Sequence, residues 1–205
     1  MKKTMLYLCC IILISSCGQR NSSNGADEGK LKDGVYTSEL AGWTIKIPAG
    51  WEVINRKAKA EIAQRGKESL EDAFDEKVGN NAHNALIAFG KTAPNTFLST
   101  IEPFSKEDEE KWDESISMIK KMLYTGYLNQ GIPVDTTSTT TELIDRMEFK
   151  KFTTDIYSPG GKIEMSQTIY CTLIDHKLFA VNINYDNEAD RDEMLEAFRN
   201  STFKR

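Results

Sequence analysis

Few side chains in this sequence have both the type and the spacing that catalysis or metal binding requires. Two histidines occur in 205 residues, His83 and His176. Neither has a second histidine, a cysteine or a carboxylate at helical or Cys-x-x-Cys spacing, so the sequence predicts no zinc site. Cys171 lies between Tyr170 and Thr172 in a predicted strand. We expect its thiol to be buried and inert, because a reactive thiolate needs a cationic and accessible setting. We therefore expect no metal ion and no cofactor.

Carboxylates are the remaining candidates for chemistry. The segment 186–193 alternates oxygen-bearing side chains as a calcium-binding loop does, but Arg191 stands at the sixth position, where the sharp turn requires glycine. We interpret this segment as the charged N-terminus of a helix. Glu102 and Asp155 could belong to an enzyme site assembled from distant residues, although the sequence alone does not group them. It contains no Gly-x-Ser-x-Gly motif, no phosphate-binding loop motif and no dinucleotide fingerprint.

Thr136 is a candidate modification site at the start of the threonine-rich segment 136–141. The structural interpretation of this segment is a polar, β-branched edge strand. Asp135-Thr136-Thr137 also resembles the Asp-Ser/Thr-hydrophobic sequon of an O-glycosylation system that acts on exported proteins in some bacteria. That resemblance implies a glycan on Thr136, and both interpretations remain open at this point.

The first sixteen residues have the pattern of an export signal. Met1-Lys2-Lys3 is basic, and the apolar run 5–14 is too short to cross a bilayer. Ser15, Ser16 and Cys17 follow, an order that resembles the lipobox of bacterial lipoproteins. The resemblance implies that residues 1–16 are a signal peptide, that cleavage follows Ser16, and that the thiol of Cys17 is diacylglycerated. The alternative is an ordinary secretory signal with a chance cysteine.

The predicted lipid at Cys17 makes a membrane the first expected partner, since two or three acyl chains anchor a protein almost permanently. Residues 17–33 contain few apolar side chains and are predicted to form a flexible tether. Gly18 and Gln19 lack the aspartate that retains lipoproteins at the inner membrane in well-studied envelopes, so analogy favours the outer membrane. A formal net charge of -5 argues against a nucleic-acid partner, which requires clustered positive charge.

Residues 34–205 are predicted to form a single α+β domain. From about residue 135 the apolar period becomes two, which predicts four strands joined by tight turns and therefore an antiparallel meander. With the earlier strands, where residues 52–54 resume the strand 43–47 after a turn, about six to seven strands covered by helices are expected. The predicted strand segments are 43–47, 52–54, 85–91, 96–102, 135–144, 148–157, 162–174 and 178–185. Strands 85–91 and 96–102 are expected to form a hairpin.

Three helices are expected. One covers residues 58–75. The second begins at Ser105, which forms a capping box with Asp108, and its stripe of apolar side chains should face the sheet. That stripe consists of Trp112, Ile116, Ile119, Leu123 and Tyr127. Asp186 or Asn187 caps the third helix, whose Met194, Leu195 and Phe198 should face inward.

Two short motifs resemble the PsbP-like and Mog-like superfamily. Residues 45–51 (Ile-Lys-Ile-Pro-Ala-Gly-Trp) match its opening turn, and residues 197–203 match its closing helix and Ser-x-Phe segment. The resemblance implies an α/β/α sandwich and a soluble accessory or partner-binding protein, with no catalytic residues to carry over. We therefore expect a non-enzymatic envelope lipoprotein that binds a protein or a small ligand. The alternative is an envelope hydrolase with a carboxylate-based site.

Overall fold

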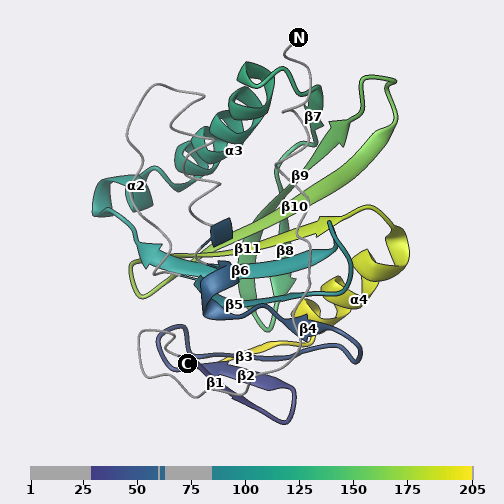
Figure 1. The fold of residues 1–205 in the computed structure, drawn as a ribbon. Helices are drawn as coiled ribbons and strands as arrows, with labels where there is room; N and C mark the ends of the chain where they lie inside the picture. The colour runs from purple at the N-terminus through teal and green to yellow at the C-terminus, as the bar shows by residue number, and fades with distance from the viewer. Residues whose placement is uncertain (1–28, 60, 63–84, 205) are drawn as a thin grey trace.

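A computed structural model describes residues 29–59, 61–62 and 85–204. Ser16, Cys17, His83 and most of the predicted helix 58–75 lie outside these residues. In the described part, the strands form two antiparallel sheets, and three helices are labelled (Figure 1). The helices are α2 (Lys106–Glu110), α3 (Trp112–Asn129) and α4 (Glu188–Arg199).

The large sheet contains the predicted meander. Its strand order is β4-β5-β6-β11-β10-β9-β7, with β8 also paired to β9. Every one of these pairs is antiparallel, so the expected α+β class with an antiparallel meander is confirmed. The strands are β4 (Glu52–Val53), β5 (Ala85–Gly90), β6 (Thr96–Pro103), β7 (Val134–Thr136), β8 (Thr140–Ile144), β9 (Met147–Tyr157), β10 (Ile163–Ile174) and β11 (Lys177–Tyr185).

Two hairpins of the meander turn through residues with positive φ. Asp145 and Arg146 join β8 to β9, and Asp175 and His176 join β10 to β11. Two consecutive residues in this conformation form a type I′ turn, whose twist matches that of the flanking strands. Both turns were predicted from the sequence at these positions.

A second, four-stranded sheet begins inside the predicted tether. Its order is β1-β2-β3-β12, formed by β1 (Gly29–Lys32), β2 (Val35–Ser38), β3 (Trp43–Lys46) and β12 (Thr202–Phe203). The prediction of a tether reaching residue 33 was therefore wrong for its last five residues. Asp33 and Gly34 both have positive φ, and this Asp-Gly turn pairs β1 with β2.

The predicted strand 135–144 is divided in two, which is a further correction. Both β7 and β8 pair with β9, which is long enough to receive them one after the other. Between them, the Thr137 hydroxyl accepts a hydrogen bond from the backbone N–H of Thr153 at 2.9 Å. A threonine side chain thus takes the place of a backbone acceptor, which interrupts the regular ladder.

The predicted helix from Ser105 is also divided, at Lys111, into α2 and α3. The Ser105 cap is confirmed, because its Oγ accepts a hydrogen bond from the Asp108 N–H at 3.1 Å. The return bond differs from that of a capping box, since the Asp108 carboxylate accepts from the Ser105 hydroxyl. Beyond the break, Trp112 packs edge-on against Phe104, with ring centroids 5.8 Å apart.

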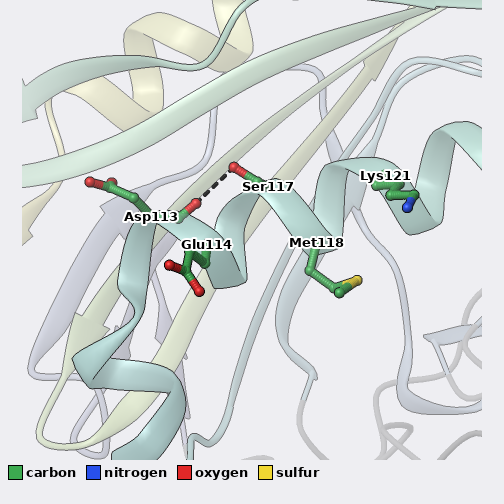
Figure 2. A pocket seen from close by; sticks show the side chains of 5 residues that line it. All are labelled: Asp113, Glu114, Ser117, Met118 and Lys121. Carbon is green, nitrogen blue, oxygen red and sulfur yellow. Dashed lines mark hydrogen bonds between the residues drawn. The ribbon is translucent and has the colours of Figure 1, made fainter.

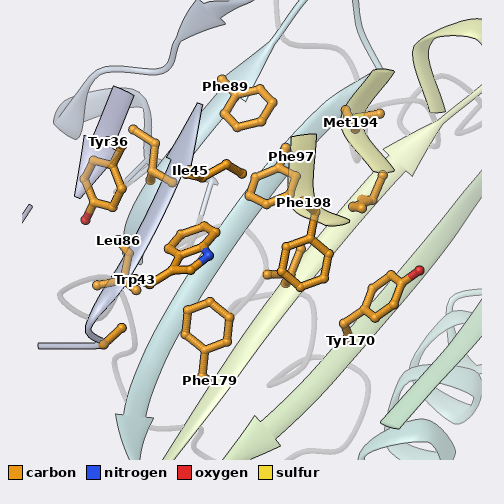
Figure 3. Close-up of a cluster of buried hydrophobic side chains, with 14 of the residues drawn as sticks. Tyr36, Trp43, Ile45, Leu86, Phe89, Phe97, Tyr170, Phe179, Met194 and Phe198 are labelled. Atoms are coloured by element: carbon orange, nitrogen blue, oxygen red, sulfur yellow. The ribbon is translucent and has the colours of Figure 1, made fainter. Parts of the chain in front are cut away.

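Two cores lie on opposite faces of the large sheet. The aromatic core, centred on Trp43, lies between the large sheet, the small sheet and α4 (Figure 3). Helix α3 lies on the other face (Figure 1), and its Ile116 belongs to the α3-side core. Its buried residues are Ile116, Phe152, Ile169, Cys171 and Leu178. The layer opposite α3 therefore consists of α4 together with the small sheet.

The last helix matches its prediction closely. Asn187, rather than Asp186, is the N-cap, and its Oδ1 accepts from the Asp190 N–H at 2.9 Å. Met194 and Phe198 are buried in the aromatic core, and Leu195 packs against it. Among the described residues, the structure contains no helix with the length and apolar character needed to cross a membrane.

Candidate functional site

The two carboxylates that the sequence offered for catalysis lie on opposite faces of the large sheet. Glu102 on β6 is paired across strands with Leu178, a member of the α3-side core, and burial raises the pKa of this carboxyl. Asp155 on β9 accepts a hydrogen bond from Ser166 at 2.6 Å. Ser166 is four residues from Tyr170 on β10, so both side chains point to the face of the aromatic core. Glu102 and Asp155 therefore do not form one site.

Cys171 and His176 are equally separate. Cys171 is buried, and burial, followed by the charge of Glu102, raises the pKa of its thiol to about 12. The thiol therefore stays protonated and non-nucleophilic at neutral pH. His176 lies in the exposed turn before β11, with Nδ1 3.0 Å from the Glu109 carboxylate. Across residues 29–59, 61–62 and 85–204, no group of three His, Cys, Asp or Glu side chains is placed to hold a metal ion.

The acidic segment 186–193 lies at the N-terminus of α4, as predicted, and its carboxylates bind side chains from two turns. Lys91 Nζ lies 2.8 Å from Asp190 and 3.3 Å from Glu193. The indole N–H of Trp51 donates to Glu193 at 2.6 Å. Hydrogen bonds from Asn187 and Lys91 lower the pKa of Asp190. These contacts fasten the turn before β6 and the Trp51 turn to α4, and the carboxylates are occupied by them.

A second ionic cluster surrounds Glu142 on β8. Its Oε2 accepts from Lys151 at 2.8 Å and from the Tyr170 hydroxyl at 3.1 Å, and its Oε1 accepts from Arg199 Nε at 2.7 Å. Burial alone would raise the pKa of this carboxyl, but hydrogen bonds from Arg199 and Lys151 hold it at about 2. The cluster ties the edge of the large sheet to the end of α4.

Replacing Glu142 with glutamine should therefore destabilise the protein by about 2 kcal/mol at neutral pH. The folded pKa of about 2 lies below the ordinary 4.5. The contribution of the carboxylate is thus fully present above about pH 4.5 and is lost as the pH falls toward 2. Urea unfolding from pH 7 to pH 3 should show less acid destabilisation in Glu142→Gln than in wild type. Glu148→Gln, at an exposed position on β9, is the control. An equal loss of unfolding free energy between pH 7 and pH 3 in Glu142→Gln and in wild type would contradict the prediction.

A row of polar side chains crosses five strands on the face that carries α3. Cross-strand pairing aligns Thr96 on β6 with Asn184 on β11, Asn184 with Gln167 on β10, Gln167 with Thr154 on β9, and Thr154 with Thr136 on β7. Gln167 is two residues from Ile169 of the α3-side core, which identifies the face. We call Thr96, Asn184, Gln167, Thr154 and Thr136 the polar row.

The polar row is hydrogen-bonded at one end and open in the middle. Asn184 donates to Thr96 at 3.2 Å, and Gln167 Nε2 donates to Asn184 Oδ1 at 3.2 Å. Gln167 Oε1 and Thr154 Oγ1 are buried and, in the part of the chain that the structure describes, have no hydrogen-bond partner. Gln167 is 7% exposed and Thr154 is 0% exposed.

Asn182 extends this set toward the α3-side core. It is paired with Ile169 and is therefore the diagonal neighbour of Gln167, within reach of a long side chain. Its Oδ1 is also buried and lacks a partner among the described residues. We call Gln167 Oε1, Thr154 Oγ1 and Asn182 Oδ1 the open acceptors. A buried polar atom without a partner costs about 1–3 kcal/mol, so a ligand or water that donates hydrogen bonds here would be stabilised.

The polar row was not predicted from the sequence, although Thr136 at one end of it was a candidate modification site. Thr136 is half-buried in β7, and its backbone N–H donates to Asp135 Oδ1 at 2.7 Å. Glycosylation of Thr136 remains a prediction. Asn182 and Asn184 alternate with the buried Val181 and Ile183, and that polar alternation in a central strand was the available signal.

An open hollow of about 360 Å³ lies on the outer side of α3 (Figure 2). All of its described lining residues belong to α3: Asp113, Glu114, Ser117, Met118 and Lys121. Asp113 is engaged by Lys150 at 2.7 Å, and Ser117 donates to the Asp113 carbonyl at 2.8 Å. The described lining of this hollow comes from one helix, whereas the polar row brings polar side chains from five strands together.

Comparisons with known proteins give a likeness of backbone arrangement. No family model matches the chain, and no curated protein matches it. Among solved structures, it is similar to the cyanobacterial PsbP (CyanoP) of Synechocystis sp. PCC 6803, at 11% sequence identity and a TM-score of 0.49. The match covers 93% of this chain and 99% of that one. The fold class described above rests on strand order and register alone.

Proposed function

We propose that this protein is a lipid-anchored, non-catalytic binding module of the bacterial cell envelope, with the polar row as its ligand site. The observation that carries the proposal is the set of open acceptors, three oxygen atoms on one face of the sheet that have no hydrogen-bond partner among the described residues. Asn184 belongs to the row and Asn182 adjoins it; both residues are only partly buried, so the β11 side of the row borders solvent.

The anchoring part of the proposal rests on the lipobox-like sequence that ends at Cys17. The outer membrane is the proposed location, by the analogy drawn from Gly18 and Gln19. An accessory role is in keeping with the PsbP-like and Mog-like motifs at residues 45–51 and 197–203. A hydrolase would need ionisable groups that converge, whereas Glu102 and Asp155 lie on opposite sheet faces.

The experiment follows the side-chain amides of the row. The full chain, purified in mild detergent and labelled with ¹⁵N, is titrated with the low-molecular-mass fraction of the cell envelope. We expect the side-chain amide signals of Gln167, Asn182 and Asn184 to shift, and Gln167→Leu to abolish the shifts of the other two. Gln130→Leu is the matched control, because Gln130 bonds to the Gly126 carbonyl at the end of α3 and is not a member of the row.

Two results would contradict this function. Shifts confined to other surfaces, such as the outer face of α3, would place binding elsewhere. Reproducible turnover of esters, peptides, phosphates or glycosides that disappears in Glu102→Gln or Asp155→Asn would favour the hydrolase instead.

A further inference from the structure

The open acceptors are all neutral oxygen atoms. Two belong to carboxamides and one to a hydroxyl, and an acceptor of this kind requires an N–H or O–H donor. A ligand that satisfied all three at once would have to present at least three donors. A ligand composed mainly of acceptors, such as a phosphate or a carboxylate, would leave them unsatisfied.

Within residues 29–59, 61–62 and 85–204, the charged side chains lie away from the row or are already engaged. On the same sheet face, Glu102 is six residues along β6 from Thr96, roughly 20 Å at the rise of a strand. Lys150 is four residues along β9 from Thr154, roughly 13 Å, and is paired with Asp113. Lys120 donates to the Thr137 carbonyl at the β7 end.

This distribution of charge selects an uncharged ligand. A cation bound at the open acceptors would lose its hydration without gaining a counter-charge, which is unfavourable in a buried site. Asn182 is paired across strands with Leu98 on β6 and with Ile169 on β10, so apolar side chains adjoin the acceptors. A molecule that combines several hydroxyls with an apolar ring face fits both features.

We propose that the polar row binds a neutral, hydroxyl-rich small molecule of the sugar class. Its hydroxyls donate to Gln167 Oε1, Asn182 Oδ1 and Thr154 Oγ1, and its C–H face packs beside Leu98. This inference rests on the proposed function, because it specifies the ligand of the same site.

The test compares three probes of one ring size and different charge. Methyl β-D-glucopyranoside is neutral, D-glucosamine is cationic and D-glucuronate is anionic at neutral pH. Each is titrated into the ¹⁵N-labelled full chain in detergent, and the side-chain amides of Gln167, Asn182 and Asn184 are followed. We expect saturable shifts with the neutral probe and at least ~10-fold weaker binding of both charged probes, the ratio that one unpaired buried polar or charged group produces.

Variants separate binding from folding. Thr154→Val and Gln167→Leu should each weaken binding of the neutral probe at least ~10-fold, whereas Gln130→Leu should leave it unchanged. Thr154→Val should melt at or above the wild-type temperature, because it removes a buried hydroxyl that lacks a partner in the described structure. Loss of binding in a variant that melts normally assigns the effect to the site.

Each contrary result has a separate meaning. Tighter binding of glucosamine or glucuronate than of the neutral probe would overturn the inference and leave the proposed function standing. The same conclusion follows if none of the three probes binds while the envelope fraction still shifts the row amides. If neither the probes nor the envelope fraction shifts them, the row holds water, and the inference and the proposed function both fail.

Discussion

Replacing Trp43 with alanine is expected to lower the free energy of unfolding by about 3–5 kcal/mol, the loss typical of truncating a fully buried aromatic side chain. Trp43 is 0% exposed and lies at the centre of the aromatic core. Chemical denaturation of the full chain in detergent measures the change, with the slope against denaturant confirming that the compactness of the end states is unaltered.

The size of this loss follows from what Trp43 joins. Its ring stacks on Phe97 of β6 at 6.3 Å and on Phe203 of β12 at 6.2 Å, and it meets Phe179 of β11 edge-on at 5.1 Å. Each such aromatic pair contributes about 0.5–1.5 kcal/mol beyond the area that it buries. The indole N–H donates to the buried Ser201 Oγ at 2.9 Å. One side chain therefore connects the small sheet, the large sheet and the segment after α4. Figure 3 shows Trp43 among Phe97, Phe179 and Phe198.

Two variants serve as controls for Trp43. Trp43→Phe keeps an aromatic ring and loses the hydrogen bond to Ser201, so its cost should be smaller than that of Trp43→Ala. Trp112→Ala, at a half-buried position that packs edge-on against Phe104, should cost about 1–2 kcal/mol. An equal loss of unfolding free energy in Trp112→Ala and Trp43→Ala would contradict the prediction that Trp43 contributes more to stability.

The elements that sequence reasoning predicted correctly are those with a long periodic signal or a specific turn. Strands β9, β10 and β11 have nine to twelve residues and are separated by tight turns. The two-residue hydrophobic period and the turn residues therefore indicate the same strand boundaries. Helix α4 has a cap, acidic residues in its first turn and inward-facing Met194 and Phe198. Each of these features is local, and the residues that specify them are close together in the sequence.

Of the small sheet, only β3 was predicted, as strand 43–47; β1, β2 and β12 escaped prediction because they are short. β1 has the sequence Gly-Lys-Leu-Lys, which resembles a tether. Its place depends on pairing with β2, where Leu31 lies opposite Tyr36. The Asp33-Gly34 turn was a usable signal, because this dipeptide favours the type I′ geometry of a two-residue hairpin.

Strand β10 shows why alternation alone does not identify a solvent-exposed face. Glu164, Ser166, Thr168, Tyr170 and Thr172 formed the more polar alternate set in the sequence, yet Tyr170 is 1% exposed in the aromatic core. Both faces of a central strand are covered here, so alternation does not report solvent exposure.

The polar row is beyond single-strand reasoning because it exists only across strands. Its members come from β6, β7, β9, β10 and β11, and their alignment depends on four separate registers. A shift of any register by one residue would move that strand's member to the opposite face. The sequence offers the polar residue types, whereas the fold brings them into line.

Replacing Cys17 with alanine is expected to remove the protein from the membrane fraction and leave it uncleaved or released. The reason is that the thiol of Cys17 is the proposed attachment point of the diacylglyceryl group, and each buried CH₂ of an acyl chain contributes about 0.8 kcal/mol to membrane binding. The measurement is fractionation of the full chain from cells, combined with mass spectrometry of its mature N-terminus. In wild type the N-terminal residue should be Cys17 carrying a lipid.

Cys171→Ala is the matched control, because it makes the same chemical change at a buried thiol inside the folded part. That variant should remain in the membrane fraction with its N-terminal lipid intact, even if losing a buried sulfur lowers its stability. Two observations would contradict the anchor. One is an unmodified Cys17 at the mature N-terminus in native membranes. The other is membrane retention of Cys17→Ala after salt and carbonate washes with residues 1–16 removed, since the tether would then be held by something other than a lipid on this thiol.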